Sequence, residues 1–149
     1  MTQEDKELLL KDLCARLPYN VICQVEFKEN GNYNSKVMLL SGIFTDEAYF
    51  TTKGGSIYSN EYKPYLFPLS SMTDKQAKEI QEIVGNPDNA CIIRKTDGLE
   101  LWLNSIDTDP TIWVDTIFEV QDYLKKNHFD YRGLIEKGLA IDATGLNIY

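Results

Sequence analysis

Between residues 21 and 62, short runs of alternating side chains follow one another, and turns rich in Asn and Gly separate several of them. In the run VICQVEF, the odd-numbered positions from 21 to 27 are apolar, and two of the three positions between them are polar. A period of two is typical of a β-strand with one buried face. The runs KVMLLSGIF, AYFTT and SIYSNEY come next. Short turns join neighbouring antiparallel strands, so the segment predicts a meander of three or four antiparallel strands.

Gly42 interrupts the longest of these runs. A glycine inside a strand marks a bulge or a sharp bend, because it has no side chain to pack. We therefore expect a small sheet that curls at this position. The pattern is compatible both with an open curled sheet and with a closed barrel.

Three segments predict helices. Thr2 with Asp5, and Thr73 with Gln76, have the spacing of a capping box, which marks the starts of helices over residues 3–16 and 74–84. The segment 110–126 carries apolar side chains at positions 113, 117, 120 and 124, which is a helical spacing. Between the second and third helices, ACIIRKTDGLELWLN has the form of a β-hairpin with Asp97 at its tip.

The order of these elements predicts an α+β fold, in which a small curled antiparallel β-meander, open or barrel-like, and a β-hairpin pack with three main α-helices. A length of 149 residues and an apolar content of 43% suit one domain covering residues 1–149. The segment KPYLFPLSSMT contains Pro64 and Pro68, which lack the N–H group that a central strand needs. We expect an extended connector there.

The charge balance limits the class of partner. The chain has 23 acidic and 15 basic side chains and a net charge of -8. An acidic protein repels the phosphate backbone, so direct nucleic-acid binding is disfavoured. Cys14, Cys23 and Cys91 are widely spaced, and the pattern is typical of reduced thiols acting as small apolar side chains. One histidine does not complete a usual zinc site, so we expect no metal and no cofactor.

The amino-terminal stretch MTQEDKELLLKDLC lacks the basic and apolar regions of a signal peptide. The chain contains no run of about 18 consecutive apolar residues, which a transmembrane helix needs. We therefore expect a cytoplasmic protein without a membrane partner. The oligomeric state stays open.

The stretch NHFDYRGLIEKGLAID, residues 127–142, contains the single histidine of the chain. His128 beside Asp130 and Arg132 has the composition of an acid–base site, because an imidazole pKa near 6.5 suits proton transfer. Catalysis also needs a nucleophile or a metal in a pocket, and no such partner is evident. A histidine that follows a helix commonly binds the free carbonyls there. The structural role is favoured, and no catalytic residue is assigned.

Four aromatic side chains gather before the second expected helix. Rigid aromatic residues are favoured at the centres of protein interfaces. Together with His128 and Arg132 they form the set of candidate partner-binding residues, whose aromatic members are Tyr58, Tyr62, Tyr65 and Phe67.

Two blocks, KPYLFPLSSMT and NHFDYRGLIEKGLAID, carry a resemblance that covers about a fifth of the chain. In these blocks the chain resembles small uncharacterised proteins encoded by gut Bacteroidetes genomes and by their phages and prophages. The resemblance implies a bacterial or phage origin and a cytoplasmic location. It implies no activity and no catalytic residue.

These observations favour a non-enzymatic module that binds a macromolecule, and a protein is the expected partner. One alternative is a small-molecule-binding protein or an enzyme that uses His128 with Asp130 or Arg132. A second alternative is an acidic, phage-type inhibitor that mimics nucleic acid and binds a host nucleic-acid-binding protein.

Overall fold

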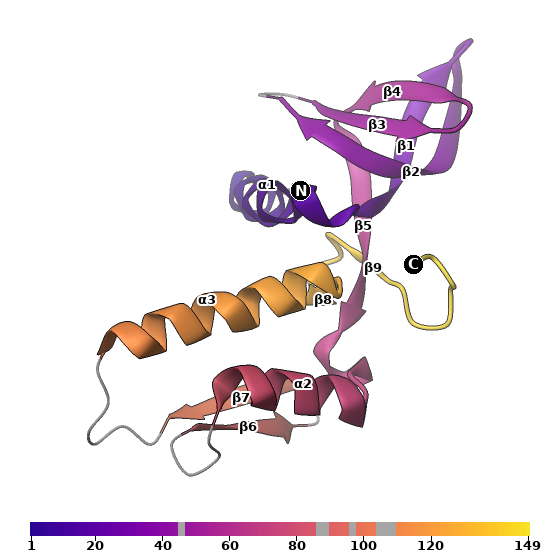
Figure 1. The fold of residues 1–149 in the computed structure, drawn as a ribbon. Helices are drawn as coiled ribbons and strands as arrows, with labels where there is room; N and C mark the ends of the chain where they lie inside the picture. The colour runs from indigo at the N-terminus through magenta and orange to yellow at the C-terminus, as the bar shows by residue number, and fades with distance from the viewer. Residues whose placement is uncertain (45–46, 86–89, 96–97, 104–109) are drawn as a thin grey trace. The chain divides into compact units, whose positions relative to one another are not determined.

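A computed structural model describes residues 1–44, 47–85, 90–95, 98–103 and 110–149, and for residues 90–95, 98–103 and 110–114 the description covers the backbone alone. The chain forms two compact units. The first contains residues 1–66 and 132–149, and the second contains residues 67–131. The strand β5 (Glu61–Pro68) begins in the first unit and ends in the second (Figure 1).

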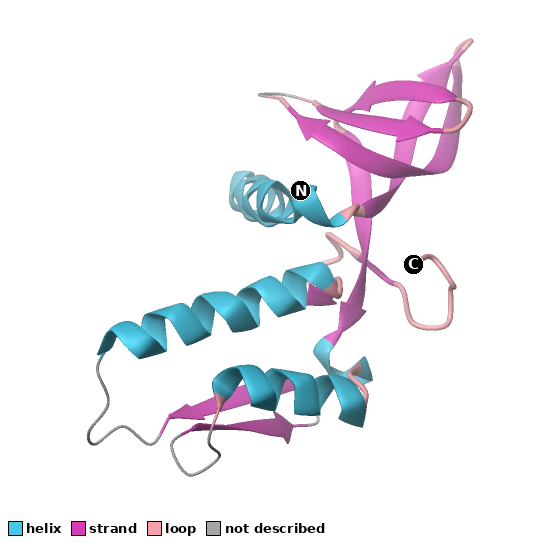
Figure 2. Ribbon diagram, viewed as in Figure 1, coloured by secondary structure: helices cyan, strands magenta, loops and turns pink. Residues whose placement is uncertain are grey.

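The first unit consists of one helix and a curled sheet (Figure 2). Its helix α1 (Gln3–Arg16) starts with the expected capping box between Thr2 and Asp5. The strands in this unit run in the order β4, β3, β2, β1, β5, and β9 pairs in parallel with β5. Their bounds are β1 (Ile22–Glu29), β2 (Asn32–Ile43), β3 (Ala48–Thr52), β4 (Gly55–Ser59) and β9 (Ile141–Asp142).

The apolar stripe of α1 and the inner face of the sheet form the core of the first unit. Leu13 on the helix and Val25 and Phe50 on the strands are fully buried. The segment after residue 131 completes this core, because Leu134 is also fully buried within the same cluster. The remaining buried members of the cluster are Leu9, Val21, Cys23, Met38, Leu40, Ala48, Leu66, Leu139 and Ala140.

The sheet curls where the sequence predicts it. The pairing of β2 with β3 shifts register between Leu40 and Gly42, which is a β-bulge. The curl brings the last residue of β4 to β1, where the Ser59 hydroxyl donates a hydrogen bond of 2.7 Å to the carbonyl of Glu26. The sheet stays open, because β4 pairs along its length with β3 and ends the order of strands.

The second unit consists of two helices and a hairpin. The helix α2 (Asp74–Val84) starts with the expected capping box between Thr73 and Gln76 and ends at Gly85. The other elements are β6 (Ala90–Lys95), β7 (Gly98–Leu103), α3 (Pro110–Lys126) and β8 (Phe129–Asp130). The Tyr123 hydroxyl on α3 donates a hydrogen bond of 2.6 Å to Glu79 on α2. The buried core of this unit is formed by Met72, Ile80, Val84, Leu124 and Phe129.

The expectation that KPYLFPLSSMT is a connector and no central strand is wrong. Its first part belongs to β5, which lies between β1 and other strands in the order of the sheet. The prolines are tolerated because β5 changes partner along its length. Pro64 is the last residue that pairs with β1, Tyr65 and Leu66 pair with β9, and Pro68 is the last residue that pairs with β8. Each proline therefore lies where one ladder ends.

The α+β class, the curled meander, the hairpin and the three helices are confirmed. Counted through β5, seven of the nine described strands form one mixed sheet, and β6 and β7 form a separate hairpin. The expected hairpin tip at Asp97 lies outside the described residues. The single domain of residues 1–149 stays a prediction beside the two units. No helix in the described part of the chain is long and apolar enough to cross a membrane.

Candidate functional site: a groove between two strand edges

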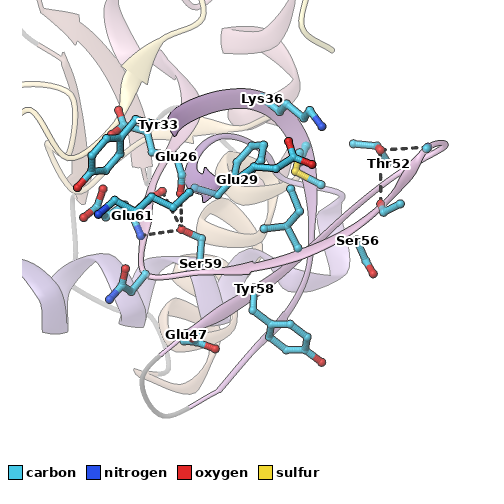
Figure 3. Close-up of a pocket in the computed structure, with 17 residues that line it drawn as sticks. Glu26, Glu29, Tyr33, Lys36, Glu47, Thr52, Ser56, Tyr58, Ser59 and Glu61 are labelled. Atoms are coloured by element: carbon cyan, nitrogen blue, oxygen red, sulfur yellow. Dashed lines mark hydrogen bonds between the residues drawn. The ribbon is translucent and has the colours of Figure 1, made fainter. Parts of the chain in front are cut away.

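A groove of about 780 Å³ lies between β1 and β4 in the first unit (Figure 3). Four consecutive residues of β1, Glu26 to Glu29, and all five residues of β4, Gly55 to Ser59, line it. Successive side chains of a strand point to opposite faces. Because every residue of these two stretches lines the groove, the groove lies along the edges of the strands and is not confined to one face of the sheet.

Two features of the fold open the groove. The first is the short ladder between β1 and β5, which ends at the pair Glu26–Glu61, so Phe27, Lys28 and Glu29 have a partner in β2 alone. The second is the position of Ser59, which joins the end of β4 to Glu26 and also accepts a hydrogen bond of 3.0 Å from the N–H of Glu61. Ser59 thus connects β4 to β1 and β5, and the groove extends from Ser59 along the rest of β4.

The groove has an apolar floor and exposed aromatic side chains. Met38 is buried beneath it, and Ile57 packs against the core of the first unit. Tyr33 and Tyr58 line the groove and are 71% and 57% exposed. Exposed aromatic rings beside an apolar floor are typical of surfaces that bind another molecule.

The groove carries an excess of negative charge. The ammonium group of Lys28 lies 4.7 Å from the centre of the Tyr33 ring, and that of Lys36 lies 5.1 Å from the centre of the Phe27 ring. Both cations of the groove are thus held against aromatic rings of the protein itself. Four exposed carboxylates line the same groove and have no ion pair within the described residues: Glu26, Glu29, Glu47 and Glu61.

Two of these carboxylates face each other across a ladder. Glu26 and Glu61 are direct partners in the antiparallel pairing of β1 with β5. Like charges directly opposite each other on neighbouring strands destabilise a sheet. The first unit therefore keeps an unfavourable pair at the mouth of the groove.

Two further hollows adjoin the groove in the first unit, with volumes of about 650 Å³ and 390 Å³. Asn60, in the turn between β4 and β5, lines all three hollows. Tyr62 lines both smaller ones. The turn between β4 and β5 thus borders all three hollows.

The candidate tyrosines of the first unit have three different environments. Tyr58 is exposed and contacts the ring of Tyr49, with 4.9 Å between the ring centres. Tyr62 is half-buried and lies 5.2 Å from the ring of Phe50, and burial raises the pKa of its hydroxyl. Tyr65 is buried, with 7% of its surface exposed. Of these three, only Tyr58 presents most of its side chain to a partner.

Phe67 and His128 belong to the second unit. Phe67 is half-buried, and its N–H donates a hydrogen bond of 2.9 Å to the carbonyl of His128. His128 is 9% exposed and has a positive φ of 58°, and its N–H binds the carbonyl of Lys125 at 3.1 Å. These backbone bonds end the helix α3 and lead the chain into β8. Asp130 is 7% exposed.

Arg132 belongs to the first unit, where it takes part in a buried charge cluster. The Arg16 side chain binds Asp12 with an Nε–Oδ2 distance of 2.6 Å, and both side chains are fully buried. Arg132 reaches the same carboxylate, with an Nε–Oδ1 distance of 3.3 Å and 24% of its side chain exposed. The cluster joins α1 to the segment that follows residue 131. Arg132 thus acts as a structural cation in this cluster.

Buried hydroxyl and thiol groups of the first unit stay protonated. Burial raises the pKa of the Cys23 thiol, so this cysteine is an inert apolar side chain, as the sequence predicts. The same prediction is wrong for Cys14, which is exposed. Burial also raises the pKa of Tyr149, whose hydroxyl donates a bond of 2.7 Å to the carbonyl of Tyr65 and accepts one from the N–H of Ile22. Among the described residues, no three His, Cys, Asp or Glu side chains are placed to hold a metal ion.

Sequence reasoning missed the groove and the charge cluster. The cluster had a signal, because Asp12 and Arg16 are four residues apart and each lies three residues after a leucine of the buried stripe, Leu9 or Leu13. The groove had none, because it depends on which strand edges the curl of the sheet brings together. Comparisons of the chain with models of protein families, with curated proteins and with solved structures gave no match.

Proposed function

We propose that the protein is a non-enzymatic module that binds another protein through the groove between β1 and β4. The observation that carries the proposal is the groove itself, in which two strand edges lie beside the exposed rings of Tyr33 and Tyr58. Protein interfaces are centred on such aromatic side chains and are completed by polar groups at the rim. The proposal places the protein in the cytoplasm of a bacterium, in keeping with the resemblance described above.

The test is affinity capture from a lysate of a gut Bacteroidetes bacterium by the immobilised full chain. We expect one or a few proteins to be captured reproducibly. Substitution of Tyr33 and Tyr58 by serine should reduce that capture by about tenfold or more, as for aromatic residues at the centre of an interface.

Phe118 supplies the matched control, because it is 63% exposed and lies on α3 in the second unit. Phe118→Ser should leave capture unchanged. Loss of capture with Phe118→Ser but not with the two tyrosine substitutions would move the binding surface away from the groove.

The enzyme alternative has less support from the geometry. His128 and Asp130 are buried, and Arg132 is bound to Asp12. A chain that captures no protein but turns over a small molecule, with loss of turnover in His128→Ala, would favour the alternative.

The acidic-inhibitor alternative has one observation in its favour, which is the set of four exposed carboxylates at the groove. It requires that the captured protein bind nucleic acid and that the chain compete with the nucleic acid for it. A competition assay with the captured protein and duplex DNA decides this point, because a partner bound through another surface would still bind DNA.

A further inference from the structure

We propose that the groove binds an extended segment of the partner protein, with alternating basic and apolar side chains, as an additional strand on the free edge of β4. This inference rests on the proposed function and adds to it the chemistry of the partner and the mode of binding. Addition of a strand to an exposed sheet edge is a common mode of peptide recognition, in which backbone hydrogen bonds supply affinity and alternate side chains supply specificity.

One edge of β4 has no strand partner. β4 ends the order of strands, and its other edge lines the groove along all five residues. A loop of two residues joins β3 to β4, and Thr52 and Gly55 flank it as direct partners. In such a hairpin the flanking residues form a hydrogen-bonded pair, and the next pair does not bond across the ladder. The N–H and C=O groups of Ser56 and Tyr58 therefore point toward the groove.

The two faces of the groove explain the alternation of the ligand. Ile57, Met38 and Phe27 lie on the inner face of the curled sheet, as their pairing shows, and Glu29 and Lys36 lie on that face at its open end. Glu26 and Glu61 lie on the outer face with Lys28, because they alternate with the buried residues of β1 and pair with each other. Side chains of an added strand would alternate between these two faces. Apolar side chains would face inward, and basic side chains would face the carboxylates.

The charge of the groove selects a basic occupant. Lys28 and Lys36 lie over rings of the groove, whereas its four carboxylates have no cationic partner within the described residues. The unfavourable pair Glu26–Glu61 would become favourable when a cation of the ligand lies beside it. The edge strand β4 of a second copy of the chain contains no basic side chain, so it would leave these carboxylates without a cation.

The experiment uses the full chain and a fluorescein-labelled peptide that alternates lysine and valine over seven residues. Fluorescence anisotropy at low ionic strength measures binding. We expect the peptide to bind, and a peptide with glutamate in place of lysine to fail. Two further peptides of the same sequence carry N-methyl groups, one on its lysine amides and the other on its valine amides. The peptide whose methylated amides face β4 should bind about tenfold more weakly or worse, because the methyl groups remove hydrogen bonds to β4.

Two variants of the chain test the binding of the lysine peptide to β4 and to the groove carboxylates. Ser56→Pro removes an N–H that faces the groove and leaves the β3–β4 ladder intact, so the affinity for the lysine peptide should fall by about tenfold. The double substitution Glu26→Gln and Glu61→Gln should weaken binding and flatten its dependence on salt. The matched control is Glu82→Gln with Glu119→Gln, two exposed residues of the second unit, and it should bind as the original chain does.

The outcomes separate this inference from the proposed function. If both N-methylated peptides bind as well as the parent peptide, strand addition is wrong, even where Ser56→Pro fails to fold. If the groove carboxylates still matter in that case, the groove remains a binding site of another kind. If the lysine peptide does not bind, or binds the groove variants and the control equally, the basic-strand inference is overturned. Capture of a natural partner that depends on Tyr33 and Tyr58 would then still support the proposed function.

Discussion

The first unit contains two sets of charged side chains that differ in their burial and in the sign of the charge beside them. Asp12 and Arg16 are fully buried and bind each other at 2.6 Å, with Arg132 beside them. Glu26 and Glu61 are exposed, have like charges and face each other across a ladder. A buried charge without its partner costs several kcal/mol, whereas exposed charges change stability by less than about 1 kcal/mol. The fold therefore requires the buried charges as a set. The exposed charges have little effect on stability and are available to bind a partner.

The largest test of this contrast is Asp12→Ala. The substitution leaves Arg16 buried without its carboxylate and removes the partner of Arg132, so the free energy of unfolding should fall by about 3–5 kcal/mol. Urea denaturation followed by circular dichroism measures the change. Lys11→Ala, at an exposed position of the same helix, is the control and should stay within about 0.5 kcal/mol of the original chain. A small effect of Asp12→Ala would mean that the cluster adds little to stability.

A smaller effect is expected for Arg132→Gln. Arg132 is partly exposed, so solvent screens its ion pair with Asp12, and Arg16 remains to neutralise the carboxylate. We expect a loss of about 1–2 kcal/mol in the same denaturation experiment, as for a hydrogen bond between charged groups. A loss as large as that of Asp12→Ala would show that Arg16 alone does not compensate the buried carboxylate.

Tyr149→Phe tests a neutral contact that holds the same carboxy-terminal segment to the sheet. It removes the bonds of the hydroxyl to Tyr65 and Ile22, so stability at pH 7 should fall by about 1 kcal/mol. Burial raises the pKa of Tyr149 in the folded chain, so the hydroxyl stabilises the fold below pH about 10 and less as the pH rises above that value. The phenylalanine variant should lose part of this alkaline dependence, measured by urea denaturation between pH 8 and 11.

The smallest expected change in the free energy of unfolding is an increase. Glu61→Gln removes the repulsion with Glu26, so the free energy of unfolding should rise by about 0.2–1 kcal/mol while affinity for the lysine peptide falls. Glu82→Gln serves as the control for both measurements. A variant that loses both stability and affinity would place Glu61 among the structural charges.

Much of the fold follows from local patterns in the sequence. The capping boxes at Thr2 and Thr73, the alternation in β1 and the bend near Gly42 depend on neighbours along the chain, and all are confirmed. The connector prediction is wrong because it assumes that one partner strand pairs with the whole segment, prolines included. In the structure β5 has three partners in succession, and sequence spacing does not reveal that order.

The site was harder to predict than the fold. Tyr58 was identified because aromatic side chains are enriched at interfaces, and it does line the groove. The carboxylates that give the groove its charge look like ordinary solvated positions when each is viewed in its own strand. Their common location depends on the curl that brings β4 to β1 at Ser59. That contact joins residues 33 positions apart, and a periodic pattern carries no information at such a distance.

The division of the chain has a consequence for the order in which a ribosome-bound chain can fold. The second unit is complete once residue 131 has been synthesised. The first unit begins earlier but needs Arg132 for its charge cluster, Leu134 for its core and Tyr149 for its bond to Ile22. The segment that is translated first therefore finishes folding last.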